Sequence, residues 1–293
     1  MKSYLLTLNV LVCLISLENV ATSVTKQDFV ASGKRFDPMD YPYVVGLRIR
    51  SNFRKFSICT GTLVAPVFVL TAGHCTHEKL PSSIKVYHGS PVDEFVPQRS
   101  VRRIYSHVDY NHITMKADIS IIQIYSPFNV HRYVKLSGHP GNFENYTELK
   151  CNVLGFGQTQ YGEAGNMGYI TRALVRYGPK ACKDYNKHNI PLTWPEYLCS
   201  KPDVHMICPG DSGGPMICRG FQYGIASHGY DFHDPEREVK CGSATVQTRH
   251  LFVYPYKEWI NEILSNESNN FLGSLVTVLI SQLTIGLFTS IHV

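Results

Sequence analysis

Short apolar or alternating runs, separated by turn-forming residues, are the feature that most restricts how this chain can fold. Gly, Pro, Asn and Asp residues lie between the runs, as they do between short strands joined by turns. Many short strands at such spacing predict an all-β barrel or sandwich. The runs are Tyr43–Arg50, Thr62–Leu70, Ser83–Tyr87, Ile119–Tyr125, Cys151–Phe156, Pro215–Cys218, Tyr223–Ser227 and Ala244–Arg249.

One segment, residues 256–264, has helical periodicity instead. Its apolar side chains Trp259, Ile260, Ile263 and Leu264 fall on one face of a helix. The sequence therefore predicts a single amphipathic helix at the end of the folded domain. Hydrophobic residues make up 44% of the chain and charged residues 17%, a composition that excludes a disordered protein.

The two ends of the chain differ from its middle. Residues 1–23 start with a positive charge, continue as an apolar stretch too short to span a bilayer comfortably, and end in Ala, Thr and Ser. This is the pattern of a secretory signal peptide that is cleaved near Ser23. Residues 271–293 contain no Asp, Glu, Lys or Arg, and as a helix they would reach about 34 Å, enough to cross a membrane.

The polar spacer and hydrophobic tail, residues 265–293, allow two interpretations. A spanning anchor usually carries Lys or Arg on its cytoplasmic side, whereas no charged residue follows Glu267. The segment therefore fits a GPI signal with Ser265, Asn266 or Ser268 as the attachment residue, although its polar spacer is short. A transmembrane anchor is the alternative. Either anchor leaves the folded domain outside the cell, so we expect a secreted or extracellular protein, with the membrane tether left open.

Two further features fit a secreted chain. Of the nine cysteines, Cys13 lies in the signal peptide, which leaves an even number and so implies disulfides. Eight cysteines allow 105 connectivities, and spacing alone does not choose among them. Sequons at Asn145 and Asn266 predict N-glycosylation.

The chain has neither a CxxC pair nor a His-Glu-x-x-His motif, so we predict no metal and no cofactor.

Three short segments carry side chains suited to chemistry. Ser212 lies in the run Gly-Asp-Ser-Gly-Gly-Pro of residues 210–215, where glycines leave room for its hydroxyl and let backbone N–H groups converge. His74 ends an apolar strand beside Cys75. Asp118 leads into an apolar strand, where a buried carboxylate is costly without a partner. Each segment alone has a structural explanation, such as a glycine-rich turn.

Together, in the order His74, Asp118, Ser212, these segments resemble the motifs of the chymotrypsin-fold serine peptidases. The resemblance covers residues 30–264. It implies an all-β fold of two packed antiparallel six-stranded β-barrels with a C-terminal α-helix. It also implies a serine-type endopeptidase that needs no cofactor and acts on protein or peptide substrates, with serine protease inhibitors as further partners.

The resemblance assigns a role to each residue of the site. Ser212 attacks the scissile carbonyl, His74 takes its proton, and Asp118 orients His74. The N–H groups of Gly210 and Ser212 form an oxyanion hole. Ser227 matches the serine that supports the aspartate. The eight cysteines would pair as Cys59–Cys75, Cys151–Cys218, Cys182–Cys199 and Cys208–Cys241.

Substrate preference departs from that of trypsin. Trypsin-like members carry an aspartate six residues before the nucleophile, where this chain has Met206. A buried substrate Arg or Lys would lack a partner there, so we expect Leu, Met, Phe or Tyr instead. Gly229 keeps one pocket wall open, and the opposite wall is either Ala244 or Thr245, of which Thr245 would shorten the pocket. His228 replaces a usual aromatic, and is either a half-exposed surface histidine or a pH-sensitive subsite.

Activation is a second departure. In the family, cleavage frees an N-terminal amine that is buried against the aspartate before the nucleophile, here Asp211. The matching terminus is Val30, which makes residues 24–29 a short propeptide and the protein a zymogen. Phe29, rather than Arg or Lys, precedes Val30. We therefore expect an activating protease that cuts after aromatic residues, or self-cleavage.

Two other functions remain open. A protease homologue that binds without cleaving is the alternative, but such proteins usually lack a triad residue, and none is replaced here.

The net charge of +5 is too weakly basic to indicate a nucleic-acid partner. Two basic stretches form either a polyanion exosite or, as is commoner, solvated strand edges. These are Arg48, Arg50, Arg54 and Lys55, and Arg99, Arg102 and Arg103.

Overall fold

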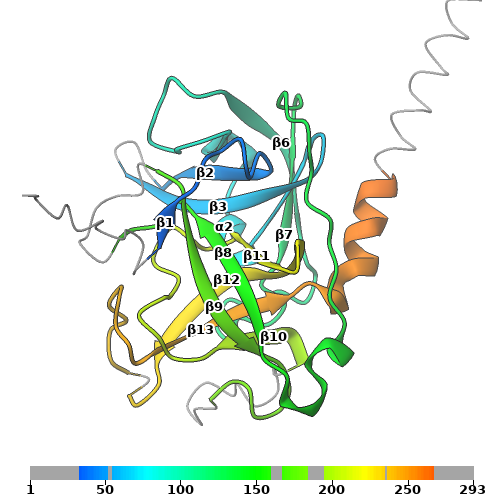
Figure 1. Ribbon diagram of the computed structural model, residues 1–293. Helices are drawn as coiled ribbons and strands as arrows, with labels where there is room; N and C mark the ends of the chain where they lie inside the picture. The colour runs from blue at the N-terminus through cyan, green and yellow to red at the C-terminus, as the bar shows by residue number, and fades with distance from the viewer. Residues whose placement is uncertain (1–32, 52–54, 160–166, 184–194, 235, 267–293) are drawn as a thin grey trace, which may run out of the picture.

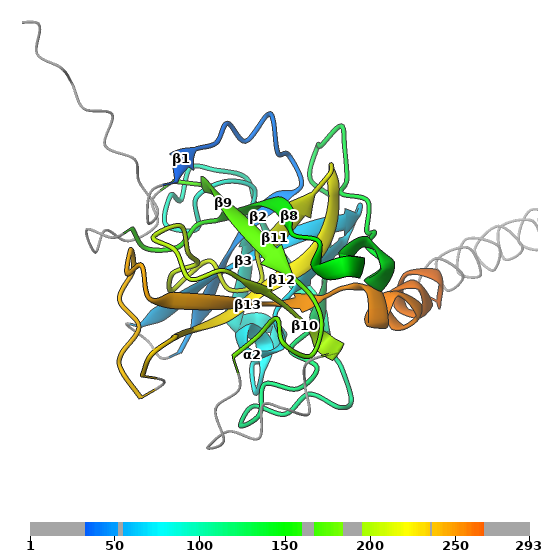
Figure 2. The same ribbon diagram turned by 60° about the horizontal axis from the view of Figure 1, so that its bottom comes forward.

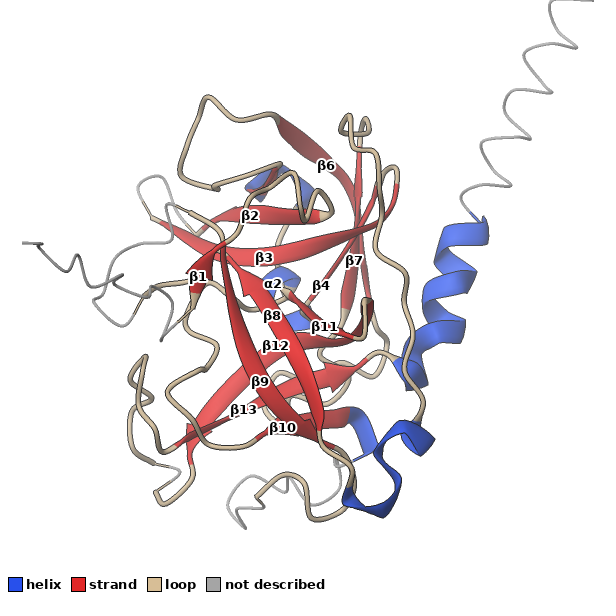
Figure 3. Ribbon diagram, viewed as in Figure 1, coloured by secondary structure: helices blue, strands red, loops and turns tan. Residues whose placement is uncertain are grey.

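The protein consists of two closed β-barrels packed side by side, as the computed structural model shows (Figures 1 and 3). Residues 33–51, 55–159, 167–183, 195–234 and 236–266 are described. The prediction of two antiparallel six-stranded barrels with a C-terminal helix is confirmed. The predicted signal peptide, propeptide, Val30 and most of the tail lie outside the described residues.

The first barrel uses one continuous part of the chain. Its antiparallel strands alternate apolar residues toward the barrel interior, so that Val45, Leu47 and Ile49 of one strand are all buried. In hydrogen-bonding order the strands are β2 (Val44–Arg50), β3 (Phe56–Ala65), β4 (Phe68–Thr71), β7 (Ser120–Ile124), β6 (Gln98–Ser106) and β5 (Ile84–Tyr87), which returns to β2.

The second barrel follows in the sequence and closes through the pairing of β8 with β9. Its order is β8 (Leu149–Gly155), β9 (Tyr169–Arg176), β10 (Tyr197–Ser200), β13 (Val246–Phe252), β12 (Phe221–Asp231) and β11 (Pro215–Cys218). A short strand, β1 (Lys34–Arg35), pairs with the first two residues of β9. A separate group of apolar side chains, including Val153, Leu198 and Met216, fills this barrel.

The strand predictions from sequence needed one correction and four additions. The run Thr62–Leu70 contains the end of β3 and the first three residues of β4, which pair as a hairpin across a turn that starts after Ala65. The sequence did not predict strands β1, β6, β9 and β10. Several charged residues interrupt the apolar pattern of β6, and only its Val101 is fully buried.

In the described part of the chain the helices are short. The predicted C-terminal helix spans residues 257–266 and lies outside the barrels in both views (Figures 1 and 2). Its Ile260 is buried, and Trp259, Ile263 and Leu264 pack against the core, as their spacing predicted. Among the described residues, no helix has the length and apolar character needed to cross a membrane. The short helices are α2 (Gly73–Thr76), η1 (Pro81–Ser83), η2 (Pro140–Tyr146) and η5 (Tyr254–Tyr256).

All four disulfides that the resemblance implies are present. Cys59–Cys75 ties β3 to α2, and Cys151–Cys218 joins directly paired residues of β8 and β11. Such bridges typically stabilise a fold by about 2–4 kcal/mol each. They therefore brace both barrels near the elements that carry His74 and Ser212.

The turn that carries Ser212 lies on the seam between the barrels. The N–H of Thr60 in β3 donates to the carbonyl oxygen of Ser212 at 2.8 Å, across the seam. Gly213 follows with a φ of +85°. A Cβ atom at this position would overlap the carbonyl oxygen of Thr60 and the hydroxyl of Thr71. Glycine is therefore required where the turn meets the first barrel.

Replacing Gly213 with alanine should lower the free energy of unfolding by more than about 4 kcal/mol, because the new methyl group overlaps β3. Gly220 is a matched control. Its φ is also +85°, but nothing lies within 4 Å of the place where its Cβ would be. Gly220→Ala should cost only the backbone strain, about 1–2 kcal/mol. Urea denaturation measures both variants, and equal losses would contradict the close contact at Gly213.

Candidate active site

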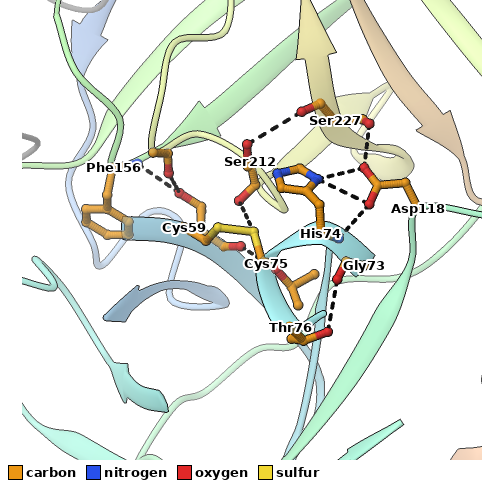
Figure 4. Close-up of a disulfide and its surroundings, with 12 residues drawn as sticks. Cys59, Gly73, His74, Cys75, Thr76, Asp118, Phe156, Ser212 and Ser227 are labelled. Atoms are coloured by element: carbon orange, nitrogen blue, oxygen red, sulfur yellow. Dashed lines mark hydrogen bonds and ion pairs between the residues drawn. A yellow bond between two sulfur atoms is a disulfide. The ribbon is translucent and has the colours of Figure 1, made fainter. Parts of the chain in front are cut away.

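Residues from both barrels meet at the seam (Figure 4). His74 lies in α2, directly after β4, and Asp118 lies just before β7 of the same barrel. Ser212 belongs to the turn before β11 of the second barrel. Figure 4 shows the His74 ring between the Asp118 carboxylate and the Ser212 side chain. The structure thus brings together three residues that are 44 and 94 positions apart, counting from His74 to Asp118 and from Asp118 to Ser212.

The carboxylate of Asp118 is fully buried and accepts several hydrogen bonds. His74 donates from its backbone N–H to Oδ1 at 2.8 Å, and its Nδ1 lies 2.9 Å from Oδ2. Burial alone would raise the pKa of Asp118, but the charge of His74 and the hydrogen bonds it receives lower the pKa overall. Asp118 is therefore held as a carboxylate.

The pKa of His74 shifts in the opposite direction to that of Asp118. Burial alone lowers its pKa, but the charge of Asp118 and the hydrogen bond between them outweigh burial, so the pKa of His74 is raised above its ordinary value of 6.5. Since the Asp118 carboxylate accepts from Nδ1, neutral His74 carries its proton there. Nε2 is left without a proton, as a base.

The hydroxyl of Ser212 has a weak partner. Its Oγ donates to the carbonyl oxygen of Ser227 at 3.5 Å, and within the described residues no hydrogen bond joins it to His74. Bonds of this kind often form only when a substrate is bound. The Ser227 hydroxyl donates to Asp118 Oδ2 at 2.5 Å, so it supports the carboxylate, as the resemblance implies.

Two backbone donors beside Ser212 are free. In the part of the chain that the structure describes, neither the Gly210 N–H nor the Ser212 N–H takes part in a hydrogen bond. Gly210 has a φ of +104°, which favours glycine, and its carbonyl oxygen accepts from the Thr60 hydroxyl at 2.9 Å. The turn is thus fixed from the opposite side while two donors stay available for an anionic oxygen.

Asp211 holds the same turn from within. Its carboxylate accepts the Gly157 N–H and the Cys208 N–H, each at 2.8 Å. Burial raises the pKa of Asp211 to about 6, although these two bonds lower it. Among the described residues no cation contacts this carboxylate. Burial without a cationic partner is what keeps the pKa of this acid above its ordinary value.

The residues predicted to form the substrate pocket are apolar or held by hydrogen bonds. Met206 is only 1% exposed and packs with Val246 and the Cys208–Cys241 disulfide. Of the two candidates for the wall, Ala244 is exposed, whereas Thr245 is half-buried and donates to Asp231 Oδ2 at 2.6 Å. The hydrogen bonds from Thr245 and from the backbone lower the pKa of Asp231 to about 2.

The structure places His228 beside Ser227 on β12. It is half-buried, and burial together with the charge of Arg249 lowers its pKa to about 3. A titration near neutral pH, which a pH-sensitive subsite requires, does not fit this environment. Sequence reasoning also missed its contact with Ser227, because the contact depends on a local irregularity of β12.

The basic stretches are only partly brought together. Arg48 and Arg50 line a surface cavity of about 420 Å³ with Lys55 and Lys85, and Glu94 pairs with Arg48 at 3.1 Å. Arg102 lines the adjoining cavity, which shares Lys85. By contrast, Arg99 lies over the Phe128 ring, and Arg103 lies over the Tyr105 ring. Arg54 lies outside the described residues.

The two predicted glycosylation sites and one cysteine–histidine cluster lie among the described residues. Asn145 and Asn266 are both exposed, as glycosylated residues must be. Cys59, His74 and Cys75 place potential ligand atoms within 4.8 Å of one another. Both sulfur atoms belong to one disulfide, so this group offers no thiolate to a metal.

Comparisons with known proteins agree with this geometry. The protein-family model described as Trypsin matches residues 30–259. Chymase of Mus musculus is 25% identical over 89% of this chain and 98% of its own length. Serine protease harobin of Hydrophis hardwickii is 28% identical over 87% of this chain and 91% of its own length.

A solved structure shares the fold. The scabies mite inactivated protease paralogue S-D1 superposes with a TM-score of 0.65, covering 80% of this chain and 96% of its own. Its sequence identity is 20%, so this likeness concerns the arrangement of the barrels alone.

Proposed function

This chain belongs to the trypsin family of serine endopeptidases, and on that premise we propose that it hydrolyses peptide bonds through an acyl-enzyme on Ser212. The observation that carries the proposal is the His74 ring, which lies between a buried carboxylate and the Ser212 side chain (Figure 4). Its substrates are proteins or peptides.

The proposed reaction has two halves. As Ser212 Oγ attacks the scissile carbonyl, its proton passes to His74 Nε2, and the carbonyl oxygen becomes an anion between the Gly210 and Ser212 N–H groups. The imidazolium then gives its proton to the leaving amine. Water attacks the acyl-enzyme by the same proton route and releases the acid. Asp118 stabilises the imidazolium in both halves without taking a proton.

A protease homologue that binds partners without cleaving is the competing function. The scabies mite structure of similar fold is described as an inactivated protease, so the fold does not by itself require catalysis. Against that alternative, this chain keeps the histidine, the carboxylate, the serine and two free N–H donors. Catalysis is therefore the better account of the site.

The preferred residue before the cleaved bond is apolar. Met206 supplies no charge at the pocket floor, and its neighbours are Val246 and a disulfide, so a substrate cation would be buried without a partner. Leu, Met, Phe and Tyr suit such a floor. Thr245, anchored by Asp231, limits the depth.

Secretion and activation complete the proposal. Four disulfides suit an oxidising compartment, in agreement with a signal peptide over residues 1–23 and a secreted or surface-tethered domain, residues 30–264. Removal of residues 24–29 frees the Val30 amine as the cation that Asp211 requires. The polar spacer and hydrophobic tail, residues 265–293, are a GPI signal or a membrane anchor. The basic cavity beside Arg48 stays a candidate exosite for polyanions.

A fluorophosphonate probe tests the nucleophile. Protein that starts at Val30 should be labelled, because His74 activates Ser212, and the Ser212→Ala variant should not be labelled while its kcat falls about 10⁶-fold. Protein that starts at Val24 should react weakly. Absence of labelling in correctly bridged Val30 protein would favour the non-cleaving homologue.

A peptide library tests the pocket. Cleavage should follow Leu, Met, Phe or Tyr, with Arg and Lys disfavoured by at least about tenfold in kcat/KM. Thr245→Gly removes the side chain anchored to Asp231, so it should shift the preference toward Phe and Tyr. Strong cleavage after Arg or Lys would contradict an uncharged floor at Met206.

The pH dependence of stability tests the Val30–Asp211 pair. In the form that starts at Val24, native Asp211 keeps its proton up to about pH 6, whereas the unfolded state loses it near its ordinary pKa of 3.8. The native state then binds more protons, so the free energy of unfolding should fall as pH rises through this window. In the form that starts at Val30, the ammonium group lowers the pKa of Asp211 and removes the fall.

Urea denaturation between about pH 4 and pH 7 measures this difference. Asp211→Asn in the Val24 form is the control, because its amide does not titrate. The same fall in both forms would contradict the pairing of Val30 with Asp211.

A further inference from the structure

The hydrogen-bonded chain that starts at His74 continues past Ser227 to a residue that none of the motifs contains. His74 Nδ1 lies 2.9 Å from Asp118 Oδ2, and the Ser227 hydroxyl donates to the same Oδ2 at 2.5 Å. His228 Nδ1 lies 2.9 Å from Ser227 Oγ. Four side chains are thus linked in the order His74, Asp118, Ser227, His228.

A bulge in β12 makes the last contact geometrically feasible. Neighbouring residues of a regular strand point to opposite faces, so Ser227 and His228 would not meet. The pairing of β12 with β13 shifts here, since Ala226 lies opposite His250 whereas His228 lies opposite Arg249. Ser227 is the extra residue. Such bulges re-aim side chains beside active sites.

The donors and acceptors along this chain are fixed by counting protons. The Asp118 carboxylate carries no proton, so the Ser227 hydroxyl must donate to it. Ser227 has then used its only proton and accepts at Oγ in its contact with His228. His228 must therefore donate from Nδ1, which defines its tautomer.

The surroundings keep His228 neutral, with this single proton. Arg249 lies directly opposite on β13, is 1% exposed and donates to the carbonyl oxygen of Lys183 at 2.9 Å. The Tyr197 ring packs edge-on against the His228 ring with centroids 5.5 Å apart. A second proton on the imidazole would face a buried cation and a phenol ring.

We propose that His228 is a positioning residue for the triad. By donating from Nδ1 to Ser227 Oγ, His228 keeps the Ser227 hydroxyl directed at Asp118. This hydrogen bond stabilises the Asp118 carboxylate and so limits how far that carboxylate raises the pKa of His74. This inference rests on the proposed role of His74 as the base. His228 acts through Ser227 and does not touch the reacting atoms.

The direction of the effect follows from the charge of Asp118. Without the His228 donor, the Ser227 hydroxyl stabilises the carboxylate less, so Asp118 becomes more basic and the pKa of His74 rises. The other titratable or charged groups that face this cluster are Tyr110, Tyr197, Glu196, Arg249 and His250. They are the same in every variant below.

Two variants of nearly equal shape separate the donor from the packing. His228→Asn keeps an N–H near the place of Nδ1, whereas His228→Leu has similar size and no donor. NMR titration of the His74 ring in protein that starts at Val30 is the measurement. The pKa of His74 should rise by about half a unit in the Leu variant and stay within about 0.2 unit of its original value in the Asn variant.

A double-mutant cycle provides the control. Ser227→Ala breaks the link, so adding His228→Leu to it should leave the pKa of His74 unchanged. Thermal unfolding checks that each variant is folded. If His228→Leu fails to fold, the comparison of His228→Asn with His228→Ala replaces it, with the same expected difference.

The readouts distinguish this inference from the proposed function. An equal pKa of His74 in the Leu and Asn variants, or an additive shift in the cycle, would overturn the positioning role. If the Val30 form is not labelled by the probe but the pKa of His74 shifts as expected in the Leu variant, only the proposed catalysis is overturned. In active protein, the acid limb of kcat/KM should move to higher pH in the Leu variant by the same amount as the NMR titration.

Discussion

A buried carboxylate is the constraint on which the rest of this structure depends. Asp118 has no exposed surface, and its charge is tolerated because donors from both barrels converge on it. His74 approaches from the first barrel and Ser227 from the second. The barrels must therefore pack in one relative position, and the close approach at Gly213 enforces the same position from the other side of Ser212.

Sequence reasoning predicted the parts of this protein that are local. The strands with continuous apolar patterns and the helical face of Trp259, Ile260, Ile263 and Leu264 were found, because periodicity reports burial directly. Strand β6 was not found, because Val101 is its only fully buried residue and its neighbours are charged. The cysteine pairs came from the resemblance, since spacing alone leaves 105 choices.

In the candidate site, too, the local features were predictable from the sequence and the contacts between distant segments were not. The segments around His74, Asp118 and Ser212 were recognisable because each keeps its chemistry in a short stretch. The contact of His228 with Ser227 and the facing of Arg249 depend on a bulge that no short stretch encodes. The basic residues of one sequence stretch likewise lie in different surroundings. Arg102 lines a cavity with Lys85, whereas Arg99 lies over the Phe128 ring.

Each barrel is built from one uninterrupted stretch, residues 44–124 for the first and 149–252 for the second. During synthesis the ribosome therefore delivers every strand of the first barrel, with His74 and Asp118, before any strand of the second. The second barrel has to wait for β13, its last strand, which pairs with both β10 and β12. The order of translation thus delays assembly of the nucleophile with its base until the chain is almost complete.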